Sequence, residues 1–278
     1  MQWRSNGLIL LLTLIFLDVF GQNIEGIVRD GVTGETLPYA HVFLTKSKTG
    51  EVGYSDGTFS ITIKPQSNND TLLIRFIGYK EQVIPINSID IDQQLIVEMK
   101  PIFYELSTVT VTDKENDLIV GNNKKSFQYT GWGDFESSRG RARGLVIKDI
   151  PCQSRVKSIG FRLKHNDWDS VAFRVNFLTM KGGEVDSAIQ TRDIIIIEKG
   201  EKEWSEFPLD SYFITLCGDI VVVLEWVDAW GPDMYGSKLL TFSISNQSGL
   251  VYRRNKGQRE GRIIEDDGVP SIYLKLYD

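Results

Sequence analysis

Apolar and polar residues alternate with a period of two along most of the chain beyond residue 22. Residues 59–63 show this pattern, and so do residues 171–177, in which Phe173 is followed by Arg174. Because successive side chains of a strand point to opposite faces, these segments are predicted to be half-buried strands, with Phe173 in a core and Arg174 in water. The nearly continuous apolar run IVVVLEW at 220–226 instead predicts a central strand covered on both faces. We find no amphipathic helix of any length, and therefore predict an all-β fold.

The chain opens with the features of a secretory signal peptide. Arg4 gives a basic start, residues 8–17 form a short apolar core, and Val19 and Gly21 are small enough to precede a cleavage site before Gln22. The alternative is an uncleaved membrane anchor, but a membrane-spanning helix needs roughly 20 apolar residues. We therefore expect residues 1–21 to be a signal peptide. The mature chain is expected to be exported to the periplasm, the cell surface or the extracellular medium, with no transmembrane segment.

A charged and turn-rich stretch divides the mature chain. Residues 113–117 are mostly charged, and residues 121–126 are rich in Gly, Asn and Lys. Domain boundaries usually fall in stretches of this kind. We therefore expect a first β-sandwich domain at 22–112, a linker at 113–126, and a second β-sandwich domain of unknown function at 127–278.

The second domain contains at least six candidate strands, which fits a two-sheet β-sandwich such as a jelly roll. They are Val156–Lys164, Val171–Thr179, Asp193–Glu198, Ile214–Trp226, Leu239–Ser245 and Ser271–Tyr277.

Residues 53–57, GYSDG, match the pattern G-x-S-x-G, which holds the nucleophilic serine of α/β-type hydrolases. That serine needs a helix after it and a histidine as its base. Here an alternating strand follows, and the two histidines, His41 and His165, fall in different domains. Asp56-Gly57 is also a strong tight-turn dipeptide between strands. We therefore predict that Ser55 belongs to a hairpin turn and is not a nucleophile.

Four motifs of the first domain occur together and in a characteristic order. They are GIVRD at 26–30, TGETLPYAHVFL at 33–44, SDGTF at 55–59 and FIGY at 76–79. In combination they resemble the carboxypeptidase regulatory-like domain, over roughly residues 22–100. The resemblance implies a small prealbumin-like Greek-key β-sandwich of seven or so strands, common in proteins exported from Gram-negative bacteria. Parts of the second domain, at 173–177 and 223–226, are similar to the C-terminal half of secreted proteins that carry the same sandwich, which implies no known activity.

The resemblance does not bring a carboxypeptidase active site with it. Zinc peptidases of that kind hold the metal with a His-x-x-Glu pair and a second histidine. Here the residues three positions after His41 and His165 are Leu44 and Trp168. The same sandwich also precedes the plug of TonB-dependent receptors, but the rest of this chain is too short for a barrel of about 22 strands. We expect no catalytic residues, no metal site and no cofactor.

Five of the six tryptophans fall in the second domain, and two of these five lie in expected loops. Trp168 belongs to HNDWDS at 165–170, and Trp230 to DAWGPDMYG at 228–236. An exposed aromatic ring beside acidic groups suits a sugar, because the ring stacks on the apolar face of the sugar while carboxylates bind its hydroxyls. The candidate ligand-binding residues are therefore Trp168, Asp169, Trp230 and Tyr235. The alternative is that these tryptophans cap the open ends of the sandwich and are buried there.

The other charged and reactive residues leave several interpretations open. The net charge of −6 gives no overall field for nucleic acid or an anionic membrane. The basic run YRRNKGQREGR at 252–262 is interpreted as a solvated loop between strands. The acidic residues at 167–169 and 265–267 could bind calcium or cap turns, and no carboxylate pair can be singled out for a glycosidase. Cys152 and Cys217 could form a disulfide or remain buried thiols.

These observations predict an exported, two-domain protein without catalytic machinery. It would be a non-catalytic interaction or structural protein of the cell envelope, with an envelope protein or a glycan as partner and no nucleic-acid partner. The alternative is a carbohydrate-binding protein that uses the loop tryptophans of the second domain. A hydrolase has the least support.

Overall fold

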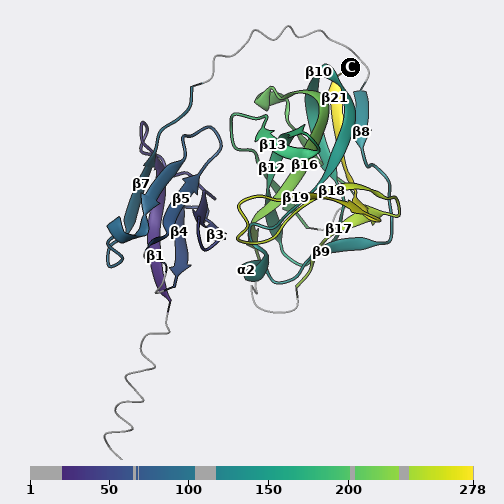
Figure 1. The fold of residues 1–278 in the computed structure, drawn as a ribbon. Coiled ribbons are helices and arrows are strands. Elements are labelled where there is room, and N and C mark those ends of the chain that lie inside the picture. Colours follow the sequence, from purple (N-terminus) through teal and green to yellow (C-terminus); the bar gives the residue numbers. More distant parts are fainter. Residues whose placement is uncertain are drawn as a thin grey trace, which may run out of the picture. The chain divides into compact units, whose positions relative to one another are not determined.

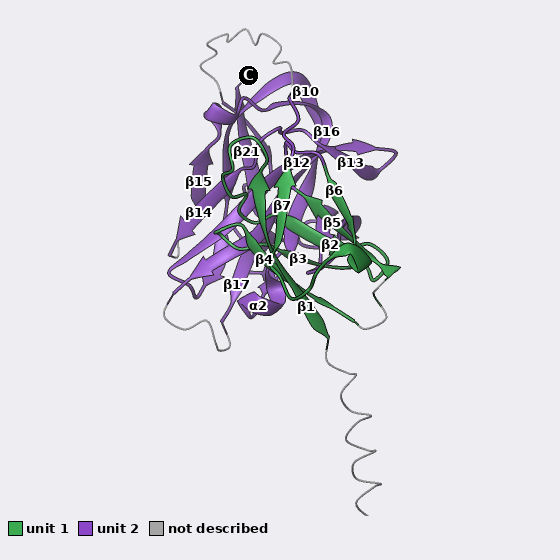
Figure 2. Ribbon diagram, turned by 90° about the vertical axis from the view of Figure 1, so that its left-hand side faces the viewer, with its two compact units in different colours: residues 1–75, 81–99 green, residues 76–80, 100–278 purple. Residues whose placement is uncertain are grey.

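The structure is a computed structural model that describes residues 21–64, 67, 69–103, 117–200, 204–231 and 238–277. The expected signal peptide, apart from Gly21, lies outside the described residues. The chain divides into two compact units (Figure 2). Unit 1 comprises residues 1–75 and 81–99, and unit 2 comprises residues 76–80 and 100–278. Within the described part of the chain, no helix is long and apolar enough to cross a membrane.

Unit 1 is a sandwich of two small sheets (Figure 1). One sheet has the strand order β4-β1-β7, with β1 and β7 parallel, and the other has the order β3-β2-β5-β6. The bounds are β1 (Gln22–Asp30), β2 (His41–Leu44), β3 (Thr49–Val52), β4 (Thr58–Ile63), β5 (Thr71–Arg75), β6 (Gln82–Pro85), the 3-10 helix η2 (Ile86–Ser88) and β7 (Leu95–Met99). The predicted seven-stranded sandwich is therefore confirmed for this unit.

The alternation of residues 59–63 has the predicted effect. Phe59, Ile61 and Ile63 are buried on the inner face of β4, whereas Ser60 and Thr62 between them are more exposed. Burial of such side chains contributes roughly 1.5–3 kcal/mol each relative to exposure in water. The alternation therefore fixes which face of the strand meets the core.

The GYSDG segment forms a turn between β3 and β4. The Tyr54 N–H donates to the Thr58 carbonyl at 2.7 Å, Gly57 has a φ of 83°, and the Asp56 carboxylate accepts from the Thr58 backbone at 2.9 Å. The turn does not close a hairpin, because β3 pairs with β2 in one sheet and β4 with β1 in the other. Ser55 thus lies in a corner between two sheets. The predicted turn is present, and its description as a hairpin is wrong.

Unit 2 contains a ten-stranded sheet and a four-stranded sheet. The long sheet follows the order β13-β12-β16-β10-β18-β19, with β14 paired to β12, β15 and β21 to β10, and β8 to β21. The short sheet follows the order β11-β17-β20, with β9 also paired to β17. The bounds are β8 (Asp117–Gly121), β9 (Tyr129–Trp132), α2 (Phe135–Ser138), β10 (Ala142–Phe161), β11 (Leu163–Asn166), β12 (Ser170–Lys181), β13 (Glu184–Ala188), β14 (Ile195–Lys199), β15 (Ser205–Pro208), the 3-10 helix η3 (Asp210–Tyr212), β16 (Thr215–Trp230), β17 (Leu240–Ser245), β18 (Gly249–Arg254), β19 (Arg262–Asp266), β20 (Val269–Pro270) and β21 (Ile272–Tyr277).

The main core of unit 2 lies on one face of the ten-stranded sheet. Its largest fully buried side chains are Trp226, Phe161, Phe173, Phe177 and Phe242. Every residue of IVVVLEW is buried in β16, which pairs with β10 and β12. The prediction of a central strand covered on both faces is therefore confirmed.

The C-terminal part of the expected linker at 113–126 belongs to unit 2. Residues 117–121 form β8, which pairs with β21, and Leu118 and Val120 pack against the core of unit 2. The side-chain amide of Asn122 then donates to the Val269 carbonyl at 2.9 Å. This short alternating segment lies among polar residues, which conceal its strand pattern. Residues 113–116 lie outside the described part of the chain.

Candidate functional sites in unit 2

Trp168 and Trp230 lie at the same end of unit 2, Trp168 in the turn between β11 and β12 and Trp230 as the last residue of β16 and not in the expected loop. Ser170, at the start of β12, pairs directly with Trp230, at the end of β16. The Trp230 side chain is 38% exposed, and Asp169 in the turn between β11 and β12 is also exposed. Trp230 and Asp169 are thus the two candidate residues that are exposed at this end of the described part of unit 2.

Trp168 does not form an exposed binding face. Its side chain is 3% exposed, and its ring packs edge-on against Trp226 with 4.9 Å between the ring centres. The Leu239 N–H donates to the Asp167 carboxylate at 2.8 Å, which attaches the start of the short sheet to this turn. Trp168 therefore follows the alternative in which the tryptophan is buried at the end of the sandwich, and it is not available as an exposed ligand-binding ring. Its polar sequence neighbours indicate a turn correctly, but the indole points into the core.

The other candidate residues add no second aromatic face within the described part of the chain. Tyr235 lies outside the described residues. The acidic residues considered for calcium take part in turns, since Asp266 accepts from the Gly268 N–H at 3.2 Å and Asp267 from the Ser248 hydroxyl at 2.8 Å.

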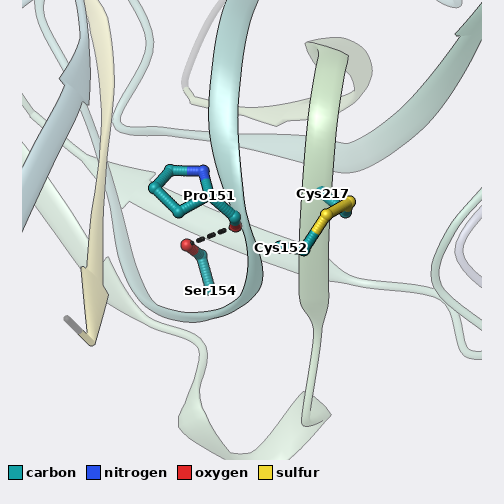
Figure 3. Close-up of a disulfide and its surroundings, with 4 residues drawn as sticks. All are labelled: Pro151, Cys152, Ser154 and Cys217. Atoms are coloured by element: carbon teal, nitrogen blue, oxygen red, sulfur yellow. Dashed lines mark hydrogen bonds between the residues drawn. A yellow bond between two sulfur atoms is a disulfide. The ribbon is translucent and has the colours of Figure 1, made fainter.

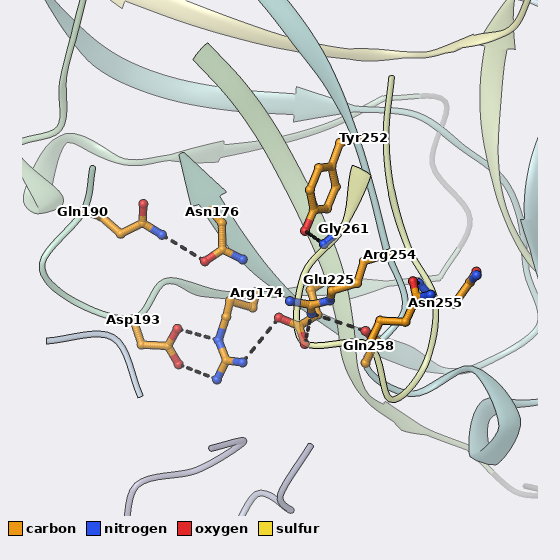
Figure 4. Close-up of polar contacts among 11 residues, drawn as sticks. Arg174, Asn176, Gln190, Asp193, Glu225, Tyr252, Arg254, Asn255, Gln258 and Gly261 are labelled. Carbon is orange, nitrogen blue, oxygen red and sulfur yellow. Dashed lines mark hydrogen bonds and ion pairs between the residues drawn. The ribbon is translucent and has the colours of Figure 1, made fainter. Parts of the chain in front are cut away.

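A network of charged side chains is buried on the opposite face of the long sheet (Figure 4). The Arg174 Nε and Nη2 atoms donate to the two carboxylate oxygens of Asp193 at 2.7 and 3.0 Å, a bidentate pair. Arg174 Nη1 lies 3.4 Å from Glu225 Oε2, and Arg254 Nη2 lies 2.5 Å from Glu225 Oε1. The Arg174 and Glu225 side chains are 4% and 0% exposed. Glu225 therefore joins strands β12, β16 and β18 from a position that water does not reach.

Arg174 stays ionised within this network. Burial alone would lower the pKa of Arg174, but the negative charges of Asp193 and Glu225 outweigh it and raise that pKa above its ordinary value. The arginine is therefore charged at every physiological pH. A group of this kind can bind an anion or fix strand positions, but it cannot exchange a proton with a substrate.

Neighbouring polar residues complete this layer. The Gln190 side-chain amide donates to the Val175 carbonyl at 3.0 Å, and its oxygen accepts from the Phe177 N–H at 2.9 Å. The Tyr252 hydroxyl accepts from the Gly261 N–H at 3.1 Å, across the hairpin of β18 and β19. Residues 255–261 of the basic run connect β18 and β19 and are exposed or half-buried, so the interpretation as a solvated loop between strands holds for them. Residues 252–254 and 262 instead belong to the two strands, and Tyr252 is buried.

Sequence reasoning missed this network. The available signal was a charged residue, Glu225, inside a run predicted to be covered on both faces, because a carboxylate in such a place needs a charged or hydrogen-bonding partner. The alternation of β12 instead placed Arg174 in water. Which charges meet depends on the register between β12, β16 and β18, and that register is not visible in the sequence.

Cys152 in β10 and Cys217 in β16 form a disulfide, with their Cα atoms 4.0 Å apart (Figure 3). The bond spans an irregular part of the sheet, where the register of β10 against β16 shifts on both sides of Ile150. The Ser154 hydroxyl donates to the Pro151 carbonyl at 2.7 Å within the same bend. Both cysteines are exposed. The question that the sequence left open is therefore answered in favour of pairing.

Residues 24–111 match the family model of the CarboxypepD_reg-like domain. The match covers about a third of the chain and includes nearly all of the seven strands of unit 1. Among curated proteins, none matches the chain. Residues 24–111 are thus a CarboxypepD_reg-like domain, the family that their sequence motifs resemble.

Proposed function

We propose that the protein is a non-catalytic interaction protein of the cell envelope, exported in its mature form. The observation that carries the proposal is the network of ion pairs among Arg174, Asp193, Glu225 and Arg254. These deeply buried charged groups of unit 2 bind one another, so they serve to hold strands together and leave binding to the surface.

Two further features support export. The leader-like residues 1–21 have the composition of a signal peptide. Cys152 and Cys217 form an exposed disulfide, and such bonds persist in oxidising compartments and are rare in the cytosol.

Export can be tested by trapping thiols in intact cells that produce the protein. The cells are treated with a bulky maleimide before and after reduction. We expect no mass increase before reduction and the addition of two labels after it. Labelling of both cysteines without reductant, with the leader still attached, would contradict export.

The interaction role can be tested by chemical crosslinking in the same cells, followed by identification of the crosslinked peptides. We expect a discrete adduct through surface residues of unit 2, or a specific glycan conjugate. A protein that remains uncrosslinked at all reagent concentrations, and that hydrolyses a substrate when purified, would contradict the proposal.

A carbohydrate-binding role is the second candidate, and the exposure of Trp230 and Asp169 at the same end of unit 2 favours it. Titration of the protein with soluble polysaccharides, followed by tryptophan fluorescence, tests it. A saturable change that Trp230→Ala abolishes would support this role. Trp168→Ala is unsuitable as a probe, because Trp168 is part of the core.

A further inference from the structure

Three arginines stand directly opposite one another on neighbouring strands of unit 2. Arg143 in β10 pairs with Arg253 in β18, and Arg253 pairs with Arg262 in β19. Residues directly opposite in a sheet point to the same face, and neighbouring strands lie about 4.8 Å apart. We call Arg143, Arg253 and Arg262 the arginine row. It lies on the face of the sheet opposite to that of the buried network, because Ala142 and Arg254 alternate with Arg143 and Arg253.

The arginine row has little negative charge of its own. Asp266 in β19 forms an ion pair with Arg253. Within the described part of the chain, Arg143 and Arg262 form no ion pair, and the Nε atoms of Arg143 and Arg253 are buried without a hydrogen-bond partner. Arg141, two residues before Arg143, has an unbonded Nε of the same kind. Several guanidinium groups thus share one carboxylate.

This arrangement costs stability in the free protein. Like charges directly opposite in a sheet are destabilising. Burial, together with the positive charges of Arg253 and Arg141, lowers the pKa of Arg143 to about 10. The guanidinium stays charged at neutral pH, so the repulsion remains. A costly cluster of this kind is what a binding surface shows when its ligand supplies the missing charge.

We propose that the arginine row binds the oxyanion groups of an acidic polysaccharide, whether phosphate, sulfate or carboxylate. Each guanidinium presents planar N–H donors that match the two oxygens of such a group. The row places its cations at the spacing of successive strands, which suits several anionic groups on one chain. Arg262 is exposed and Arg253 is partly exposed, whereas Arg143 is half-buried behind them, an uneven surface that suits a slender chain better than a flat lipid surface.

The inference rests on the proposed interaction role, and it names the chemistry of the partner. The protein as a whole carries a net charge of −6, so its overall charge does not attract a polyanion. Binding of an acidic polymer would therefore have to come from a local surface such as this one.

The test uses the whole chain without its leader and compares dextran sulfate with uncharged dextran of the same length by isothermal titration calorimetry. We expect binding to dextran sulfate only, with an affinity that falls as salt is added. The double variant Arg253→Gln/Arg262→Gln should lose at least tenfold in affinity. The matched control Arg259→Gln removes one positive charge from the turn of the same hairpin, outside the row, and should stay within about twofold of wild type.

Urea unfolding shows whether the double variant is folded; we expect its stability to equal or exceed that of wild type, because repulsion is removed. Equal binding of dextran sulfate by wild type and a folded double variant would overturn the inference. Equal binding of dextran and dextran sulfate would also overturn it and would leave the interaction role intact. Row-dependent binding to vesicles of phosphatidylglycerol, without binding to dextran sulfate, would overturn the choice of a polysaccharide.

Discussion

Asp70 connects two segments of one sheet of unit 1, and we expect its negative charge to stabilise that sheet. Its carboxylate accepts from the backbone N–H groups of Lys46 and Ser47 at 2.8 Å each, from the Ser47 hydroxyl at 2.6 Å and from the Thr71 N–H at 2.7 Å. Asp70 is 3% exposed. It thereby ties the turn after β2 to the start of β5.

The free energy by which the charged Asp70 stabilises the fold follows from the pKa of its carboxyl group. Burial works against the charged form, but the hydrogen bonds from Ser47, Lys46 and Thr71 outweigh it and lower the pKa from 3.8 to about 2. At about 1.4 kcal/mol per pKa unit, this difference amounts to about 2.5 kcal/mol. Because the folded-state pKa is the lower one, the stabilisation is present above pH 4 and is lost as the pH falls through about 2.

We therefore expect Asp70→Asn to destabilise unit 1 by about 1–2.5 kcal/mol at pH 7, and to flatten its pH dependence between pH 4 and 2. Residues 22–112 contain no tryptophan, so fluorescence reports on unit 2 alone. Hydrogen exchange of the peptides that cover β2 and β5, in increasing urea, measures unit 1 in the whole chain.

The matched control is Asp90→Asn, at an exposed turn of the same unit. It should change exchange in β2 and β5 by only a few tenths of a kcal/mol. The reasoning is refuted if Asp70→Asn costs no more than Asp90→Asn at pH 7. It is equally refuted if wild type and Asp70→Asn differ in the stability of unit 1 by the same amount at pH 2 as at pH 7.

Three further perturbations act on unit 2. Arg174→Met removes the bidentate partner of Asp193 and leaves the buried Glu225 with one arginine fewer, so it should cost about 3–5 kcal/mol in urea unfolding followed by tryptophan fluorescence; an unchanged midpoint would contradict a stabilising role of the network. Cys152→Ser should lower stability by about 2–4 kcal/mol, measured in the same way, and reductant should have no further effect on this variant. Burial, with a smaller effect of the hydrogen bond to Glu206, raises the pKa of Tyr273 to about 12, so this tyrosine stabilises the fold fully below pH 10 and its contribution is lost as the pH rises through about 12. In Tyr273→Phe the alkaline loss of stability should be smaller, as measured by unfolding at pH 9 and 11.5.

The parts of the fold that sequence predicted are those with a long apolar pattern. The alternation of β4 and the continuous apolar run of β16 each identify a strand and its covered face. Turn chemistry was equally clear at Asp56-Gly57. All of these signals are local, because they depend on residues within a few positions of one another.

The parts that sequence did not predict depend on contacts between distant segments. β8 is a short edge strand whose partner, β21, follows about 150 residues later. The sequence left open whether Trp168 is exposed or buried, and the approach of the short sheet and of Trp226 decides for burial. The disulfide likewise depends on the register of two strands whose cysteines are 65 residues apart.

Two consecutive arginines show how this register separates structural from surface roles. Arg254 faces the buried network, where its side chain is 10% exposed and pairs with Glu225. Arg253 faces the other side, where its side chain is 37% exposed and stands opposite Arg143 and Arg262. We expect Arg254→Gln to lower the free energy of unfolding by about 3 kcal/mol or more, because Glu225 loses a partner in the interior.

Arg253→Gln should behave in the opposite way. It removes a like charge from the arginine row, so the urea midpoint should stay constant or rise, while the affinity for dextran sulfate falls. Unfolding and calorimetry on the two single variants together give the comparison. If both variants lose stability to the same extent, then the two faces do not differ in role, and the alternation of side chains along β18 does not separate a structural arginine from a binding one.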